Sequence, residues 1–151
     1  MNPLARGPVF SDLSRDECEA LLSRLSIGRL AFVFQDHVDV EPIHFVFDNG
    51  RIFFRTAPGS KLTTLLHHPW VALEIDEVRG MFDWRSVVVH GTVYMLSETG
   101  SDADKVAYRD ALRALRRALP ETLRAGDPFA FRDIVVELSI DRITGRAAGS
   151  A

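Results

Sequence analysis

The sequence has a single cysteine, Cys18, and no long run of apolar residues. One cysteine excludes a disulfide within the chain, and a membrane-spanning helix needs about 20 consecutive apolar residues. The first residues also lack the basic segment and the apolar segment of a secretory signal. We therefore expect a cytoplasmic protein that has no membrane partner.

Positive charge is also scarce, because 18 Lys and Arg stand against 21 Asp and Glu and the net charge is -3. Proteins that bind nucleic acids usually carry basic residues over a whole face, so we expect no nucleic-acid partner. The sequence contains neither a P-loop nor a GxGxxG segment. The sequence therefore gives no support to the function of a nucleotide kinase.

The composition is that of a globular protein, with 46% apolar and 26% charged residues. A chain of 151 residues has the size of one ordinary domain. Residues 1–10 contain two prolines and one glycine and show little periodicity, which favours a flexible arm. We expect a single domain over residues 11–151.

Acidic residues are missing from the middle of the chain, residues 51–73. Inside this stretch a strand-like segment ends in Arg55 and Thr56, a Pro-Gly turn follows, and Ser60 and Lys61 come where a helix should begin. Cationic side chains, hydroxyls and the free N–H groups of a helix start all attract phosphate. The sequence therefore predicts an anion site at these four residues.

The hydrophobic pattern predicts a mainly β protein with peripheral helices. Helices are expected over residues 15–25, 61–67 and 102–119, and strands over residues 29–34, 38–47, 51–56, 70–75, 85–96 and 133–140. Asn49-Gly50 is the clearest hairpin signal, and Pro42 places its strand at an edge or at a bulge. Short turns between successive strands favour an antiparallel six-stranded β-barrel.

Four parts of the sequence together resemble a known family. They are Leu13–Cys18 with Ile27–Ala31, Phe54–Leu62, Trp84–Gly91 and Arg142–Arg146. In their order and spacing the chain resembles the pyridoxamine 5'-phosphate oxidase-like flavoproteins, which have the FMN-binding split-barrel fold. The resemblance implies a homodimer with FMN in clefts between the subunits, or the deazaflavin coenzyme or haem in some branches.

The resemblance also implies which residues hold the cofactor. The flavin phosphate would contact Arg55, Thr56, Ser60 and Lys61, and the flavin ring would contact Trp84, Ser86 and Val87. The expected function is that of an FMN-dependent oxidoreductase that transfers a hydride or electrons, with a small-molecule donor such as NAD(P)H. No catalytic residue of the protein is assigned.

Two departures from the family pattern limit this expectation. True pyridoxamine phosphate oxidases carry a C-terminal Arg-x-His, whereas this chain has Arg142-Ile-Thr-Gly-Arg146. Nitroimidazole-resistance proteins carry a histidine where this chain has Ser60. We therefore expect neither activity, and two alternatives stay open: a deazaflavin-dependent reductase, or a non-catalytic storage or sensor module that binds flavin or haem.

Histidines are the remaining candidate ligands. His67 and His68 are adjacent, so on a helix they point in different directions, and no cysteine or carboxylate lies at ligand spacing from them. His44 and His90 lie in predicted strands and are the candidates for haem. We expect no metal site.

Overall fold

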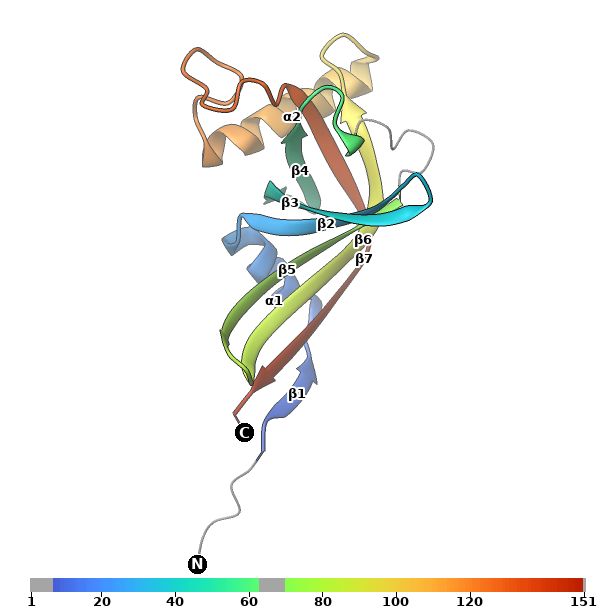
Figure 1. Cartoon of the computed structure of the whole chain (residues 1–151). Helices are drawn as coiled ribbons and strands as arrows, with labels where there is room; N and C mark the ends of the chain where they lie inside the picture. Colours follow the sequence, from blue (N-terminus) through green and yellow to red (C-terminus); the bar gives the residue numbers. More distant parts are fainter. Residues whose placement is uncertain (1–6, 63–69, 151) are drawn as a thin grey trace, which may run out of the picture.

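The computed structural model describes residues 7–62 and 70–150 and has two helices and seven strands in this part of the chain (Figure 1). In chain order the elements are β1 (Val9–Asp12), α1 (Arg15–Arg24), β2 (Ile27–Phe34), β3 (His37–Asp48), β4 (Arg51–Thr56), β5 (Trp70–Gly80), β6 (Asp83–Leu96), α2 (Asp102–Ala118) and β7 (Ile134–Gly149). In the described residues, neither helix is long and apolar enough to cross a membrane.

The strands form one antiparallel sheet that closes on itself. Their order is β1-β7-β4-β3-β2-β5-β6, and β6 pairs again with β7. Six strands, β2 to β7, therefore make a ring, and β1 is added to the outer edge of β7. This arrangement confirms the predicted mainly β, six-stranded split barrel with helices at its periphery.

Strand β7 takes part both in the closed ring and in the extension of the sheet that pairs with β1. Its first half, Ile134–Ser139, pairs with β4, and its last residues, Arg146–Gly149, pair with β1. On the other edge, β6 accompanies β7 over almost its whole length. Figure 1 shows β5, β6 and the end of β7 extending beyond the ring as a long ribbon, with β1 beside them.

Two apolar clusters stabilise the fold. The larger one fills the ring and includes three residues of α1, Cys18, Leu21 and Leu22. The smaller one joins α2 to the outer face of β4 and β7, and it consists of Phe53, Ala111, Ala114, Leu115 and Val135. The sheet thus has apolar contacts on both of its faces in the region of β4.

Local signals gave the helix starts and the hairpins correctly. The N–H of Glu17 donates to Ser14 Oγ at 3.2 Å and the N–H of Ser14 to Glu17 Oε1 at 3.3 Å, which is the predicted capping box. Asn49 and Gly50 both have positive φ, as the predicted turn requires. Burial raises the pKa of Cys18, in agreement with a cysteine that packs in the core.

Other expectations differ from the structure. Val9 and Phe10, expected in a flexible arm, lie in β1 because they pair with the far end of the chain. The helix expected over 61–67 lies mostly outside the described residues. Pro42 is at a strand edge as predicted, but without a bulge: its pairing with β2 is regular, and β4 pairs only with the later part of β3.

Gly91 permits the close approach of β6 to β7. A Cβ at this position would lie 2.0 Å from the carbonyl oxygen of Ser139, whereas a Cβ at Gly80 would meet nothing within 4 Å. We predict that Gly91→Ala lowers the free energy of unfolding by about 1 to 3 kcal/mol or more, measured by denaturant titration. Gly80→Ala is the control and should be nearly neutral; equal effects of the two substitutions would contradict this account.

Candidate functional site

Two of the predicted phosphate ligands, Thr56 and Ser60, lie together at the end of β4, and Lys61 follows them in the sequence. Thr56 is the last residue of the strand, and the N–H of Ser60 donates to the carbonyl of Ala57 at 3.3 Å. Gly59 takes a φ of +76°, which a turn with Pro-Gly at its centre requires. The turn places Ser60 Oγ 2.8 Å from Thr56 Oγ1.

Lys61 follows Ser60 directly and carries a positive charge at the surface. Its Nζ lies 2.5 Å from Asp39 Oδ2 and 5.6 Å from the centre of the Phe34 ring. The hydrogen bond to Asp39 raises the pKa of Lys61, and the same bond lowers the pKa of Asp39. The ammonium group therefore stays charged, and its three donors allow it to bind an anion as well as Asp39. We call Thr56, Ser60 and Lys61 the phosphate corner.

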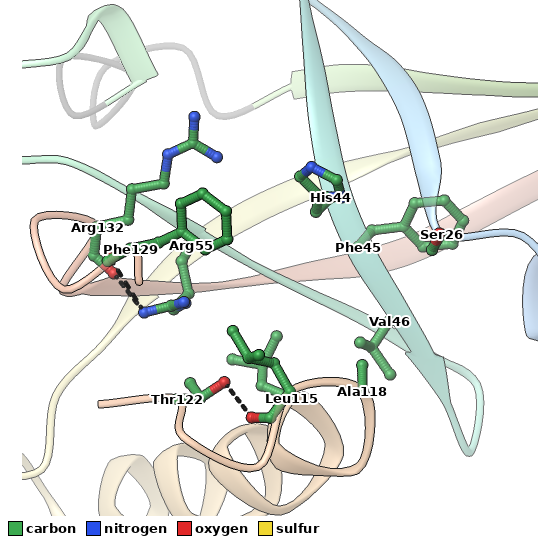
Figure 2. Close-up of a pocket in the computed structure, with 11 residues that line it drawn as sticks. Ser26, His44, Phe45, Val46, Arg55, Leu115, Ala118, Thr122, Phe129 and Arg132 are labelled. Atoms are coloured by element: carbon green, nitrogen blue, oxygen red, sulfur yellow. Dashed lines mark hydrogen bonds between the residues drawn. The ribbon is translucent and has the colours of Figure 1, made fainter. Parts of the chain in front are cut away.

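Arg55 is not part of the phosphate corner. Successive residues of a strand point to opposite faces, and the Arg55 side chain lies against the loop that follows α2 (Figure 2). Its Nη1 and Nη2 donate to the two carboxylate oxygens of Asp127 at 2.7 and 3.3 Å. The side chain of Arg55 is 9% exposed and that of Asp127 is 0% exposed. This geometry gives Arg55 a structural role.

Asp127 joins the loop after α2 to the barrel. Besides Arg55, it accepts hydrogen bonds from the N–H groups of Leu123 at 2.8 Å and Phe129 at 2.9 Å. The hydrogen bond from Arg55 holds the pKa of Asp127 well below its usual range. Sequence reasoning missed this pair because its partners are 72 positions apart and no local pattern connects them.

The predicted ring-binding residues lie at the start of β6. The Trp84 ring packs near Phe10 of β1, with 6.4 Å between ring centres. Ser86 Oγ donates to Glu74 Oε2 at 2.8 Å. Val87 is fully buried in the barrel core, on the face of β6 opposite Ser86, so its side chain does not reach the surface.

Acidic residues surround Ser86. Arg29 Nη1 lies 3.5 Å from Glu74 Oε1 and 3.3 Å from Asp76 Oδ1. Burial raises the pKa of Glu74 above its usual value. Sequence analysis did not single out Glu74 or Asp76, although their alternation along β5 places both on the face that carries Ser86.

The two predicted groups are far apart within one chain. Thr56 pairs with Ile134 at the start of β7, whereas Ser86 pairs with Arg146 near its end. At about 3.3 Å per residue, these positions are separated by roughly 40 Å along the strand. The two groups therefore lie at opposite ends of β7.

The histidines do not cluster in the described part of the chain. Residues 7–62 and 70–150 contain no group of three His, Cys, Asp or Glu side chains that is arranged to hold a metal ion. The His44 ring instead lies beside Phe129, with 6.5 Å between ring centres. His67 and His68 lie outside the described residues.

A protein-family model described as pyridoxamine 5'-phosphate oxidase matches residues 14–147. The chain belongs to this family. The matched region begins at the N-cap of α1 and ends in β7, so it includes the phosphate corner and the start of β6. Among curated proteins, an uncharacterised protein of Rhizobium meliloti (strain 1021) is 31% identical over 87 residues, which cover 58% of this chain and 58% of that relative.

Several solved structures have the same fold as this family member. An FAD-binding protein of Mesorhizobium loti is 23% identical, with 95% of this chain and 100% of that chain covered and a TM-score of 0.73. An FAD-binding protein of Mycobacterium smegmatis is 27% identical, with coverages of 91% and 99% and a TM-score of 0.67. An FAD- and haem-binding protein of the same organism is 22% identical, with coverages of 93% and 74% and a TM-score of 0.68.

The ion pair of Arg55 and Asp127 leads to a pH-dependent prediction. A carboxyl group with a lowered pKa stabilises the fold above its ordinary pKa of about 4, and this contribution is lost as the pH falls. We predict that Asp127→Asn lowers the melting temperature by several degrees at pH 7, because a buried guanidinium loses its counter-charge. The difference from the wild type should shrink below about pH 4.

Asp141→Asn is the control for this measurement, because Asp141 is an exposed residue of β7. It should leave the melting temperature nearly unchanged at both pH values. A melting temperature of Asp127→Asn equal to that of the wild type at pH 7 would contradict a structural role for the pair.

Proposed function

We propose that the protein is an FMN-binding flavoprotein that acts as an oxidoreductase, with FMN held between two subunits. The observation that carries this proposal is the phosphate corner: the hydroxyls of Thr56 and Ser60 meet, and the next residue, Lys61, carries an exposed ammonium group, in a stretch of sequence without acidic residues. Membership of the pyridoxamine 5'-phosphate oxidase family supports a flavin as the ligand.

The donors of the phosphate corner suit a phosphate group. Thr56 and Ser60 supply hydroxyl donors, and Lys61 supplies a charge-assisted donor, which forms the stronger type of hydrogen bond. No described atom lies within 4 Å of the position that a Cβ would take at Gly59, so the backbone of the turn is open to a ligand. Arg55 is left out of this group because its guanidinium is bound to Asp127.

A bound flavin would supply the hydride or electron transfer itself. The protein would bind and orient the cofactor: the phosphate corner would hold one end, and Trp84 with Ser86 would contact the ring. Glu74 would fix the hydroxyl of Ser86 through the bond that is present in the structure. A small-molecule donor such as NAD(P)H is the proposed reductant, and anaerobic bleaching of the flavin band by NAD(P)H measures this step.

The distance between the two groups supports a homodimer. The phosphate corner and Ser86 lie at opposite ends of β7, roughly 40 Å apart along the strand. A cofactor that contacts the corner of one subunit and the start of β6 in another would use both groups. A twofold axis would create two such sites.

Exposed apolar residues near both groups also support the dimer. Val38 and Val40 lie on β3 beside Asp39, the partner of Lys61, and both are exposed. Near Trp84, the exposed apolar residues are Phe10, Val78, Met81 and Phe82. Apolar surface of this kind is typical of regions covered by a partner.

A non-catalytic carrier of flavin or haem is the second candidate. It is supported by the similarity to proteins described as binding FAD, or FAD and haem. The absorption spectrum of the purified protein separates flavin from haem and from a deazaflavin. Chromatography of the released cofactor separates FMN from FAD, and failure of NAD(P)H to bleach a bound flavin would favour the carrier.

Lys61 provides a direct test of the phosphate corner. We predict that Lys61→Ala weakens FMN binding roughly 10- to 100-fold, the loss expected for one charge-assisted contact, in a titration that follows flavin fluorescence. Lys105→Ala is the matched control, because Lys105 is the only other lysine and lies exposed on α2. Unchanged affinity in Lys61→Ala would refute the site.

Subunit complementation tests the shared site. A subunit with Thr56→Val and Lys61→Ala lacks the corner, and a subunit with Trp84→Ala lacks part of the ring contact. Each homodimer should bind FMN poorly, whereas the tagged heterodimer should regain one intact site, or about half the wild-type stoichiometry. A heterodimer that binds no better than the homodimers would exclude sharing, as would a protein that stays monomeric at micromolar concentration.

A further inference from the structure

A second concave site lies on the outer face of β3 and β4, where the end of α2 and the following loop approach the sheet (Figure 2). Its volume is about 280 Å³, close to the lower end of the range for small-molecule sites. It lies on the face of β4 that carries Arg55, opposite the face that carries Thr56. We call it the β3–α2 pocket, and the proposed flavin site does not include it.

One side of the β3–α2 pocket is apolar. Leu115, Ala118 and Leu119 line it from the C-terminal end of α2, and Val46 lines it from β3. Contact with these side chains removes apolar ligand surface from water, which favours a ligand with an apolar body. The small volume restricts that body to about the size of a single ring.

The opposite side is aromatic. His44 points from β3 toward Phe129 of the loop (Figure 2), and the two rings are 6.5 Å apart between centres at an angle of 30°. Flat rings stack on such a surface with little loss of conformational freedom. The shape of the pocket therefore favours a planar ligand.

The rim carries a positive charge without a carboxylate partner. The positive charge of Arg55 is compensated by Asp127. The Arg132 guanidinium lies 5.8 Å from the centre of the Phe129 ring and forms no ion pair with any carboxylate in residues 7–62 and 70–150. None of the described residues that line the pocket is acidic. A guanidinium group is suited to hold a carboxylate through two parallel hydrogen bonds.

The hydrogen bonds of Arg55 hold this rim in place. Its Nη1 donates to the carbonyl oxygens of Phe129 at 3.4 Å and of Arg132 at 3.2 Å. The two residues that would contact a ligand are therefore tied to β4 before the ligand arrives. A preformed wall lowers the entropy cost of binding.

We propose that the β3–α2 pocket binds a small aromatic monocarboxylate. The carboxylate pairs with Arg132, and the ring lies between the aromatic side formed by His44 and Phe129 and the apolar side formed by the end of α2. The site is independent of the flavin site, because the two open on opposite faces of β4.

Benzoate and its neutral counterpart benzamide are the probes for this site. Titration of each into the purified full-length protein, followed by ligand-observed NMR, gives the two dissociation constants. Benzoate should bind at least roughly 10-fold more tightly than benzamide, because only benzoate forms the charged pair with Arg132. The same result is expected with FMN present, since the flavin occupies a different face.

Two variants locate the binding. Arg132→Gln should weaken benzoate binding roughly 10-fold and make it equal to benzamide binding. Ala118→Phe should abolish binding of both probes, because it fills the pocket from an exposed position of α2. Arg113→Gln is the matched control, since Arg113 is a highly exposed arginine of α2 that does not line the pocket.

Equal affinity of the wild type for benzoate and benzamide, or no saturable binding up to about 10 mM, would overturn the proposal. So would unchanged benzoate binding in a folded Ala118→Phe or Arg132→Gln variant, as judged by thermal unfolding. Both variants should keep wild-type FMN affinity, whereas Lys61→Ala should lose FMN affinity and keep benzoate binding.

Discussion

The pairing of β6 with β7 over nearly their whole length is the constraint on which the rest of the structure depends. It closes the ring at one end, where β7 also pairs with β4, and it forms the extended ribbon at the other, where β7 pairs with β1. The same two strands keep the phosphate corner and Ser86 apart. This separation is the reason for proposing a cofactor site that two subunits share.

Neighbouring side chains of β4 point to opposite faces of the sheet and have different roles. Thr56 points toward the phosphate corner, and Arg55, one residue earlier, points to the other face and binds Asp127. Thr56 belongs to the proposed anion site, and Arg55 fixes the loop that borders the β3–α2 pocket. Period-two alternation of the strand is enough to separate two sites that adjoin each other in sequence.

Sequence reasoning was strongest where a signal is local. The capping box at Ser14, the turn at Asn49-Gly50 and the turn that brings Thr56 beside Ser60 each depend on a few adjacent residues, and the structure has all of them. It was weakest where a contact joins distant segments. The first residues of β1 pair with the end of β7, and Arg55 pairs with Asp127, and neither contact leaves a local pattern.

The sequence by itself determined an antiparallel β-barrel with peripheral helices and the grouping of hydroxyls and a lysine in an acid-free stretch, because periodicity, turn chemistry and composition act over short distances. The split form of the barrel was implied by the family resemblance. Only the tertiary structure decided the partner and the burial of each basic residue. Arg55 and Lys61 look alike in the sequence, but the fold brings a carboxylate into full burial beside Arg55, whereas Lys61 remains at the surface with Asp39. Burial and the identity of a partner follow from long-range packing, which no short segment encodes.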